Sequence, residues 1–365
     1  MFLNKGLSIL LVLIVALMLI SSATATQTLE ILDRTDNSIT IKDGIDREVT
    51  IEGPVEKIVV LDAHQQLTSA LEAIGVYDKI VGVDIGTSQE KLLFPDIEEK
   101  TVVGTSAELD LEALLKLEPD VVFTVRSVPG DEVGQMEDIG LTVVAISLYP
   151  NPDDYFVPAL ENTRVLGAIV GAEETANEFA DWKEKYLGAI SERVADIPED
   201  EKISSLYTYR WTDSTVSSSG AKNRFHSVLD FIGTKDINND LDVDWAVIDL
   251  EEILVKDPQF IIIEEMNHLS GYDITDPSAM ESDVSAVRNL PGFDTVNAVK
   301  NNNVYILPSV LVSGDTWLAA IYMAPVFYPD LFSDFDPIAI HQEYVDKYLQ
   351  LDMDISDDTF IYPKP

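Results

Sequence analysis

Two hydrophobic periods alternate along most of the chain. Short apolar runs such as 57–62 and 121–125 are typical of buried strands, and amphipathic stretches such as 65–74 and 110–117 are typical of helices. Several of the strand-like runs are continuously apolar, which favours parallel strands covered by helices on both faces. The pattern therefore predicts an α/β fold with mostly parallel central sheets.

The predicted elements form two groups around a long helix. The first group comprises a β-hairpin over 38–51, strands 57–62, 80–83, 101–103, 121–125 and 142–146, and helices 65–74, 110–117 and 132–139. The second comprises strands 203–209, 260–264 and 303–307 and helices 225–232, 250–255 and 316–324. Between them, Phe179, Trp182, Tyr186 and Ile190 share one stripe of a predicted helix over 173–194, which would be about 33 Å long. We expect two Rossmann-like lobes joined by one long rigid helix.

The two groups contain related segments, 139 residues apart. The sequence DLEALLKLEPDVVF at 110–123 aligns with DLEEILVKDPQFII at 249–262, with five identities in fourteen positions. In each copy an Asp is predicted to cap a helix, a Pro to end it and a buried strand to follow. Any capped helix–strand unit shares part of this pattern, but the equal spacing from Glu112 to Pro119 and from Glu251 to Pro258 favours a duplication.

Charge and cysteine content exclude several classes of function. The 365 residues include 65 Asp and Glu against 24 Lys and Arg, a net charge of −41, and no Cys. Such a polyanion is repelled by phosphate backbones, so we expect no nucleic-acid partner. Without Cys there are no disulfides, thiolate metal sites, Cys nucleophiles or lipid-modified N-terminal Cys. The acidity also fits adaptation to high salt, and the sequence does not decide between that and a functional field.

The N-terminus has the pattern of an export signal. Lys5 precedes the apolar stretch Leu7–Ile20, and Ala23-Thr24-Ala25 fits a cleavage site, although an uncleaved signal anchor is the alternative. We therefore expect an extracytoplasmic protein, secreted or tethered by its N-terminus to the outer face of the membrane. The predicted division is a signal peptide (1–25), a β-hairpin extension (26–53), an N-terminal lobe (54–157), linking helices (158–196), a C-terminal lobe (197–334) and a C-terminal helix with its tail (335–365).

Motifs for catalysis and metal binding are weak. Asp240, Asp242, Asp244 and Glu251 imitate a calcium loop, but Trp245 stands where the sharp turn needs Gly. The four His residues (64, 226, 268 and 341) lack HxH or HxxxH spacing, although His64 with His226 or His268 would be the pair to ligate haem iron or a metal. Nucleotide fingerprints and a nucleophile elbow are missing. The sequence therefore predicts no enzyme, no resident cofactor and no protein-held metal.

Five segments in order resemble one family. Residues 55–84, 109–123, 250–263, 287–308 and 317–332 are similar in order and spacing to the class III substrate-binding proteins of ABC importers, which take ferric siderophores, haem and cobalamin. The resemblance covers roughly residues 38–350. It implies a monomer that binds an iron chelate in a cleft between the lobes and delivers it to a permease dimer with its ATPase. The alternatives are a corrinoid or haem as ligand, or an enzyme or surface adhesion module on the same scaffold.

The resemblance also implies roles for particular residues. Glu112 and Glu251 match the surface Glu that docks each lobe onto basic residues of the permease, although an acidic residue in a first helical turn is also favoured by the helix dipole. The ligand is expected at the carboxyl ends of strands that face the cleft, where scarce Arg residues and aromatic faces suit an anionic chelate. The predicted ligand-binding residues are His64, Gln65, Arg126, Tyr149, Tyr209, Arg210, Trp211, Arg224, His226 and His268.

Overall fold

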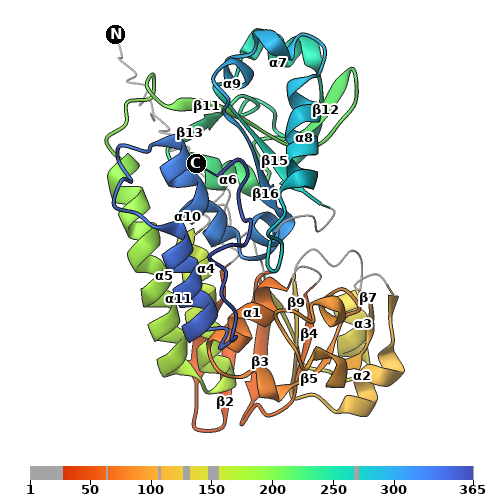
Figure 1. Cartoon of the computed structure of the whole chain (residues 1–365). Helices are drawn as coiled ribbons and strands as arrows, with labels where there is room; N and C mark the ends of the chain where they lie inside the picture. The colour runs from red at the N-terminus through yellow and green to blue at the C-terminus, as the bar shows by residue number, and fades with distance from the viewer. Residues whose placement is uncertain are drawn as a thin grey trace, which may run out of the picture.

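Two α/β lobes lie one above the other, and a pair of long helices runs along one side of both (Figure 1). The computed structural model describes residues 28–62, 65–105, 108–125, 132–146, 156–266 and 271–364. The predicted signal peptide lies outside these residues. Within the described part of the chain, no helix is long and apolar enough to cross a membrane.

The chain begins with a small antiparallel sheet. Strands β2 (Ser38–Lys42) and β3 (Glu48–Glu52) form the predicted hairpin, in which Ile39 pairs with Ile51 and Ile41 with Val49. A strand that the sequence pattern did not predict, β1 (Glu30–Arg34), pairs with β2. The alternating apolar residues of β2 and β3 are buried against the N-terminal lobe, so this sheet is part of the same hydrophobic core.

The N-terminal lobe is built on a five-stranded parallel sheet in the order β10-β9-β4-β5-β6. Its strands are β4 (Ile58–Leu61), β5 (Ile80–Val83), β6 (Thr101–Val102), β9 (Val121–Val125) and β10 (Val143–Ile146). Its helices are α1 (Gln66–Ala73), α2 (Leu111–Leu117) and α3 (Glu132–Asp138), and the short strands β7 (Gly104–Thr105) and β8 (Glu108–Leu109) pair antiparallel with each other. The strands β4, β9 and β10 are buried throughout, as expected for a sheet with both faces covered.

The C-terminal lobe has a mixed sheet. Strands β11 (Ile203–Trp211), β13 (Thr234–Asp236), β15 (Phe260–Glu265) and β16 (Val304–Pro308) are parallel, and β12 (Thr215–Ser219) is antiparallel to both β11 and the edge strand β14 (Trp245–Asp249). Its helices are α6 (Arg224–Phe231), α7 (Leu250–Lys256), α8 (Ser278–Arg288), α9 (Asn297–Lys300), the π-helix η5 (Val310–Gly314) and α10 (Thr316–Phe327). The parallel strands of this lobe bring the carboxyl ends of β11, β15 and β16 to one edge of the sheet.

Helices α4 (Phe156–Val170) and α5 (Glu173–Val194) connect the lobes and pack against each other. The predicted bounds of α5 are confirmed, and its stripe of Phe179, Trp182 and Ile190 is buried. The last helix, α11 (Pro337–Lys347), lies beside α5 (Figure 1) and brings Tyr344 to 5.9 Å from the ring of Phe179. One continuous hydrophobic core therefore joins both lobes through α5.

His341 on α11 is fixed within this core by two tyrosines. The Tyr272 hydroxyl lies 2.7 Å from its Nε2 and the Tyr322 hydroxyl 3.0 Å from its Nδ1. Burial lowers the pKa of His341 to about 3, so the imidazole is neutral in the folded protein at neutral pH. A neutral imidazole donates one hydrogen bond and accepts one, which both tyrosines satisfy.

Acid should therefore destabilise the fold through His341. Below pH 6.5 the unfolded chain takes up a proton on this residue and the folded chain does not, until the pH approaches about 3. The free energy of unfolding then falls by up to about 1.4 kcal/mol per pH unit from this group. In urea titrations below pH 6.5, His341→Gln should show a shallower loss of stability than the wild type, and equal slopes would contradict the assignment.

Candidate functional site

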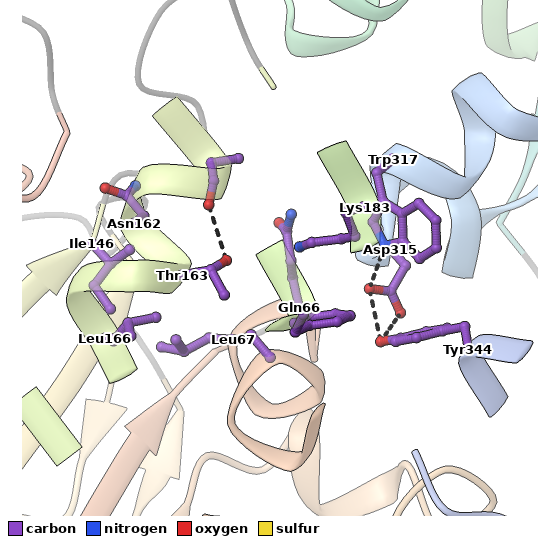
Figure 2. A pocket seen from close by; sticks show the side chains of 13 residues that line it. Gln66, Leu67, Ile146, Asn162, Thr163, Leu166, Lys183, Asp315, Trp317 and Tyr344 are labelled. Atoms are coloured by element: carbon purple, nitrogen blue, oxygen red, sulfur yellow. Dashed lines mark hydrogen bonds between the residues drawn. The ribbon is translucent and has the colours of Figure 1, made fainter. Parts of the chain in front are cut away.

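A cavity lies where the two lobes meet the linking helices, and we call it the interlobe cavity. Its volume is about 50 Å³. The lining residues come from α1, the end of β10, α4, α5, α10, α11 and the turn before α10: Gln66, Leu67, Ala70, Ile146, Ala159, Asn162, Thr163, Leu166, Phe179, Lys183, Asp315, Trp317 and Tyr344. Side chains from both lobes thus surround one space (Figure 2).

Two opposite charges line this cavity. Lys183 projects from α5 and is 9% exposed, and Asp315 precedes α10 and is 5% exposed. The Lys183 Nζ lies 4.4 Å from the centre of the Phe179 ring, and its side chain points toward Gln66 rather than toward Asp315 (Figure 2). Within the described part of the chain, this ammonium has neither a hydrogen-bond acceptor nor a carboxylate in ion-pair contact.

Asp315 is held by neutral donors. The Tyr344 hydroxyl lies 3.2 and 3.3 Å from its two carboxylate oxygens, and Trp317 Nε1 donates to Oδ1 at 3.4 Å. Burial raises the pKa of Asp315 to about 6, against the positive charge of Lys183, which lowers it. Burial likewise lowers the pKa of Lys183 to about 8, and Asp315 opposes that shift. Both side chains are therefore charged near pH 7.

The N-terminal lobe contributes a strained turn beside the cavity. Gln65, a predicted ligand residue, is 8% exposed and takes a left-handed conformation with φ of 48° immediately before α1. The buried Asp62 precedes it, and its Oδ2 accepts hydrogen bonds from the Thr68 amide at 2.8 Å and hydroxyl at 3.3 Å. Burial raises the pKa of Asp62 well above its usual range, and the charge of Asp84 adds to that shift. A non-glycine left-handed residue at the carboxyl end of a strand is typical of functional turns.

The C-terminal lobe contributes a polar network at the end of β15. The buried Glu264 accepts hydrogen bonds from the Tyr207 hydroxyl, from Ser309 Oγ at 3.0 Å and from Ser313 Oγ at 2.9 Å. Arg224, a predicted ligand residue on the first turn of α6, donates to Ser313 Oγ and to the Val312 carbonyl at 3.4 Å. This guanidinium is therefore tied to η5, and its charge lies close to that of Glu264.

Aromatic rings continue from this network. Tyr209 meets Trp245 edge-on at 4.7 Å, and Trp245 lies 5.9 Å from the Tyr207 ring. Arg210 stacks over Tyr209 at 5.5 Å from the ring centre. Tyr207 connects these rings to Glu264, which shares Ser313 with Arg224. We call the set of Tyr207, Tyr209, Arg210, Arg224 and Trp245 the aromatic–arginine cluster.

One local prediction about these residues was wrong. The predicted strand over 203–209 was too short, because β11 continues to Trp211 and so includes Arg210 and Trp211, which were expected to follow the strand. They stay in a strand because Arg210 and Trp211 pair with Ser217 and Val216 of β12, whose antiparallel pairing the apolar pattern did not reveal.

Among the described residues, histidine and acidic side chains elsewhere do not assemble a metal site. His226 lies 3.5 Å from the buried carboxylate of Asp236, away from any second described histidine ligand. The acids of the apparent calcium loop are held singly by Lys256, Lys222 and Asn223, at 3.4 Å to Asp240, 2.9 Å to Asp242 and 2.7 Å to Asp244. In the described ranges, no group of three metal-ligating side chains converges.

Four of the predicted ligand residues lie outside the described residues: His64, Arg126, Tyr149 and His268. Their positions follow β4, β9, β10 and β15 in the chain, and their roles stay predictions.

Four residues that the structure places in the cavity or the polar network were not predicted: Lys183, Asp315, Tyr207 and Glu264. For Lys183 a signal existed, because it stands four residues after Phe179 and four before Leu187 on the buried stripe of α5.

The two predicted docking residues occupy equivalent places. Glu112 and Glu251 are both exposed, and each is the second residue of a seven-residue helix, α2 or α7. The two helices lie at the outer ends of the two lobes (Figure 1). Each helix ends in a left-handed acidic residue, Glu118 with φ of 49° and Asp257 with φ of 46°, followed by Pro and a buried strand. This shared local geometry supports the duplication.

The two helix starts differ in one respect. Asp110 accepts a hydrogen bond from the Ala113 amide at 2.9 Å, as predicted for a capping residue. Asp249 occupies the equivalent position, but its side chain makes no capping hydrogen bond, so that prediction was wrong for the second copy. Its backbone is the last residue of β14, paired with Thr215, and this pairing sets the approach of the chain to α7.

Comparison with known proteins identifies relatives over most of the chain. Residues 58–311 match the model of a family described as periplasmic binding protein. The molybdate-binding protein MolA of Haemophilus influenzae is 22% identical over 350 residues, which span 87% of this chain and 90% of MolA. A cobalamin-binding protein of Halobacterium salinarum is 24% identical over 236 residues, 64% of this chain and 60% of that protein.

Solved structures share the fold. The TroA-like periplasmic binding protein FepB from Veillonella parvula superposes with a TM-score of 0.73 at 22% identity, covering 88% of this chain and 98% of FepB. MolA bound to molybdate gives a TM-score of 0.70 at 20% identity, covering 87% of this chain and 98% of MolA. At these identities the likeness shows a two-lobed fold and leaves the ligand to the residues of each protein.

Lys183 and Asp315 should be energetically coupled. Lys183→Met and Asp315→Asn each leave the other charge uncompensated in the cavity, and each should lower the free energy of unfolding by about 1–3 kcal/mol. The double variant should lose less than the sum by more than about 0.5 kcal/mol in urea titrations. Lys185→Met, on the exposed side of the same helix, is the control and should show no coupling to Asp315→Asn. Additive losses for Lys183 and Asp315 would contradict the electrostatic link.

Proposed function

The chain belongs to the periplasmic binding protein family, whose members are substrate-binding transport proteins of ABC importers, and we propose that this member binds an iron chelate between its lobes and delivers it to a permease. The family places the protein outside the cytoplasm. We further propose that residues 1–25 direct its export and leave it secreted or tethered by the N-terminus.

The interlobe cavity is the observation that carries this proposal. It is lined by α1 of one lobe, Asp315 and Trp317 of the other and Lys183 of the connecting helix, so a ligand that inserts one group there would contact all three parts. Ligand sites in α/β proteins lie at the carboxyl ends of strands, where Gln66 and Ile146 border the cavity. A site shared in this way lets binding fix the relative position of the lobes, which a permease can detect.

The aromatic–arginine cluster supports a metal chelate as the ligand. Tyr209, Trp245 and Arg210 offer flat apolar faces beside a positive charge, a combination that suits an anionic complex with apolar or aromatic arms. The cluster lies at the carboxyl end of β11, on the same sheet edge as the ends of β15 and β16. A ferric siderophore has this chemistry.

Two relatives favour second candidates. MolA, which aligns over most of this chain, binds molybdate, a compact oxyanion. The Halobacterium relative binds cobalamin, a corrinoid whose planar ring would also suit aromatic faces. Both candidates keep the same role in transport and differ in the part of the site that would carry recognition.

Ligand-dependent stabilisation tests the proposed chelate. A thermal-shift panel of ferric siderophores, haem, cobalamin, molybdate and free metal ions should raise the melting temperature most with a ferric siderophore. A ligand at 100 times its Kd stabilises the folded state by about 2.7 kcal/mol. Stabilisation by cobalamin or molybdate alone would show that this compound, and not an iron chelate, is the ligand. If no member of the panel raises the melting temperature, the iron-chelate proposal is overturned.

Docking through Glu112 and Glu251 is tested by charge reversal. Among the described residues neither carboxylate forms an ion pair, so both are available to basic residues of a permease. Glu112→Arg with Glu251→Arg should abolish most ligand uptake by cells lacking the native protein while leaving ligand binding intact, because two charge-assisted contacts become repulsive.

The control for docking changes the net charge of the protein by the same amount as the Glu112 and Glu251 variant. Glu174 and Glu192 are exposed acids on α5, away from α2 and α7, so Glu174→Arg with Glu192→Arg should leave uptake near the wild-type rate. Unchanged uptake by the Glu112 and Glu251 variant, with its ligand binding intact, would show that these residues do not dock the protein.

A further inference from the structure

Lys183 has an unusual place for a basic residue of this chain. The acids outnumber the basic residues by 65 to 24, and surface cations find acidic partners readily: Arg34 reaches Glu173 at 2.9 Å and Arg193 reaches Asp334 at 2.7 Å. Of the lysines and arginines that the structure describes, Lys183 alone is buried. A buried ammonium is costly unless it is paired and hydrogen-bonded, so its retention requires a compensating partner.

The protein supplies only part of that compensation. Asp315 gives a favourable charge, but its oxygens accept from Tyr344 and Trp317, and the Lys183 side chain points away from it toward Gln66 (Figure 2). The carbonyl oxygen of Asn162 is taken by the Leu29 amide at 2.7 Å. Among the described residues none accepts a hydrogen bond from the Lys183 ammonium, so water or a bound molecule in the cavity is placed to supply the acceptor.

We propose that Lys183 recognises an anionic group of the transported ligand, an oxyanion or carboxylate that enters the interlobe cavity and accepts hydrogen bonds from the lysine ammonium. This inference rests on the proposed function and assigns the ligand an acidic group. Burial and the opposing charge of Asp315 leave the pKa of Lys183 at about 8, so the ammonium is protonated at neutral pH.

The size of the cavity limits what can enter. A space of about 50 Å³ suits a few water molecules or one oxyanion group, and it is too small for a whole metal chelate. Without ligand, water would hydrate the ammonium. The ligand's acidic group would replace that water with a charge-assisted hydrogen bond, which is shorter and stronger than a neutral one.

The position of the cavity links this group to the rest of the ligand. Gln66 opens α1 directly after the strained Gln65, and Ile146 is the last residue of β10. Both mark the edge of the N-terminal sheet where its strands end. The body of a chelate bound at that edge would therefore direct one acidic arm toward Lys183, whereas molybdate would occupy the cavity as a whole ion.

Binding measurements on three probes separate these sources. The probes are sodium molybdate, a ferric complex of 2,3-dihydroxybenzoate, which carries free carboxylates, and an uncharged ferric trihydroxamate. The main variant is Lys183→Met with Asp315→Asn, which removes both charges and leaves no unpaired carboxylate in the cavity. Lys185→Met on the exposed side of α5 is the matched control. Circular dichroism melting of each variant without ligand verifies the fold, and Lys183→Gln serves if the double variant does not fold.

We expect the wild type to bind an anionic probe and the double variant to bind it at least about tenfold more weakly, with Lys185→Met unchanged. Loss of molybdate binding identifies the free oxyanion as the source, and loss of binding to the carboxylate-bearing complex identifies a chelate arm. The carboxylate-bearing ferric complex, if it binds the wild type and the double variant equally, would overturn the role of Lys183 and leave the proposed function standing, whereas equal binding of molybdate alone would overturn both. Binding of the trihydroxamate alone would also overturn the role of Lys183 and leave the proposed function standing. If no probe binds, the role of Lys183 and the proposed function are both overturned.

Discussion

The packing of α5 against both lobes is the constraint on which the rest of the structure depends. Its 22 residues bury one stripe in a core that extends from the strands of the N-terminal lobe to α6 and α10 of the C-terminal lobe. Trp182 meets Trp317 at 5.4 Å and Tyr348 at 4.8 Å, so α10 and the chain end after α11 close around the same helix. Close-packed cores deform little, and ligand binding can therefore move the lobes only slightly.

The same packing explains why a charged cavity is found at this point. A stripe made wholly of apolar residues would seal the junction of α1, α5 and α10, but Lys183 interrupts it and Asp315 faces the gap. Such a pair contributes less stability than apolar residues of similar volume would. Breaks in local consistency of this kind are expected at functional sites, where stability is lost in exchange for recognition. In the proposed function, the cavity would recognise an acidic group of the ligand and the aromatic–arginine cluster would recognise its flat body.

The sequence allowed most of the fold and the family to be predicted, because strong local patterns determine them. Helix α5 has an amphipathic stripe, and β9 and β5 are apolar runs bounded by turn signals, so their bounds were predicted correctly. Strand β14 was not predicted because it lies at a sheet edge with Trp245 and Val247 exposed, so its sequence lacks the apolar run of a buried strand. The Lys183–Asp315 pair was missed because 132 positions separate residues that only tertiary packing brings to one cavity.

Amide hydrogen exchange, with and without a ligand that binds, tests the central claim most directly, because it reports where a ligand sits. If the ligand binds between the lobes, saturating amounts should slow exchange at the start of α1 and in the segment Val310–Trp317, on opposite sides of the interlobe cavity. Exchange in α2 and α7 at the outer ends should be unaffected. Protection confined to α2, α7 or another outer surface, with α1 and 310–317 unchanged, would contradict the account.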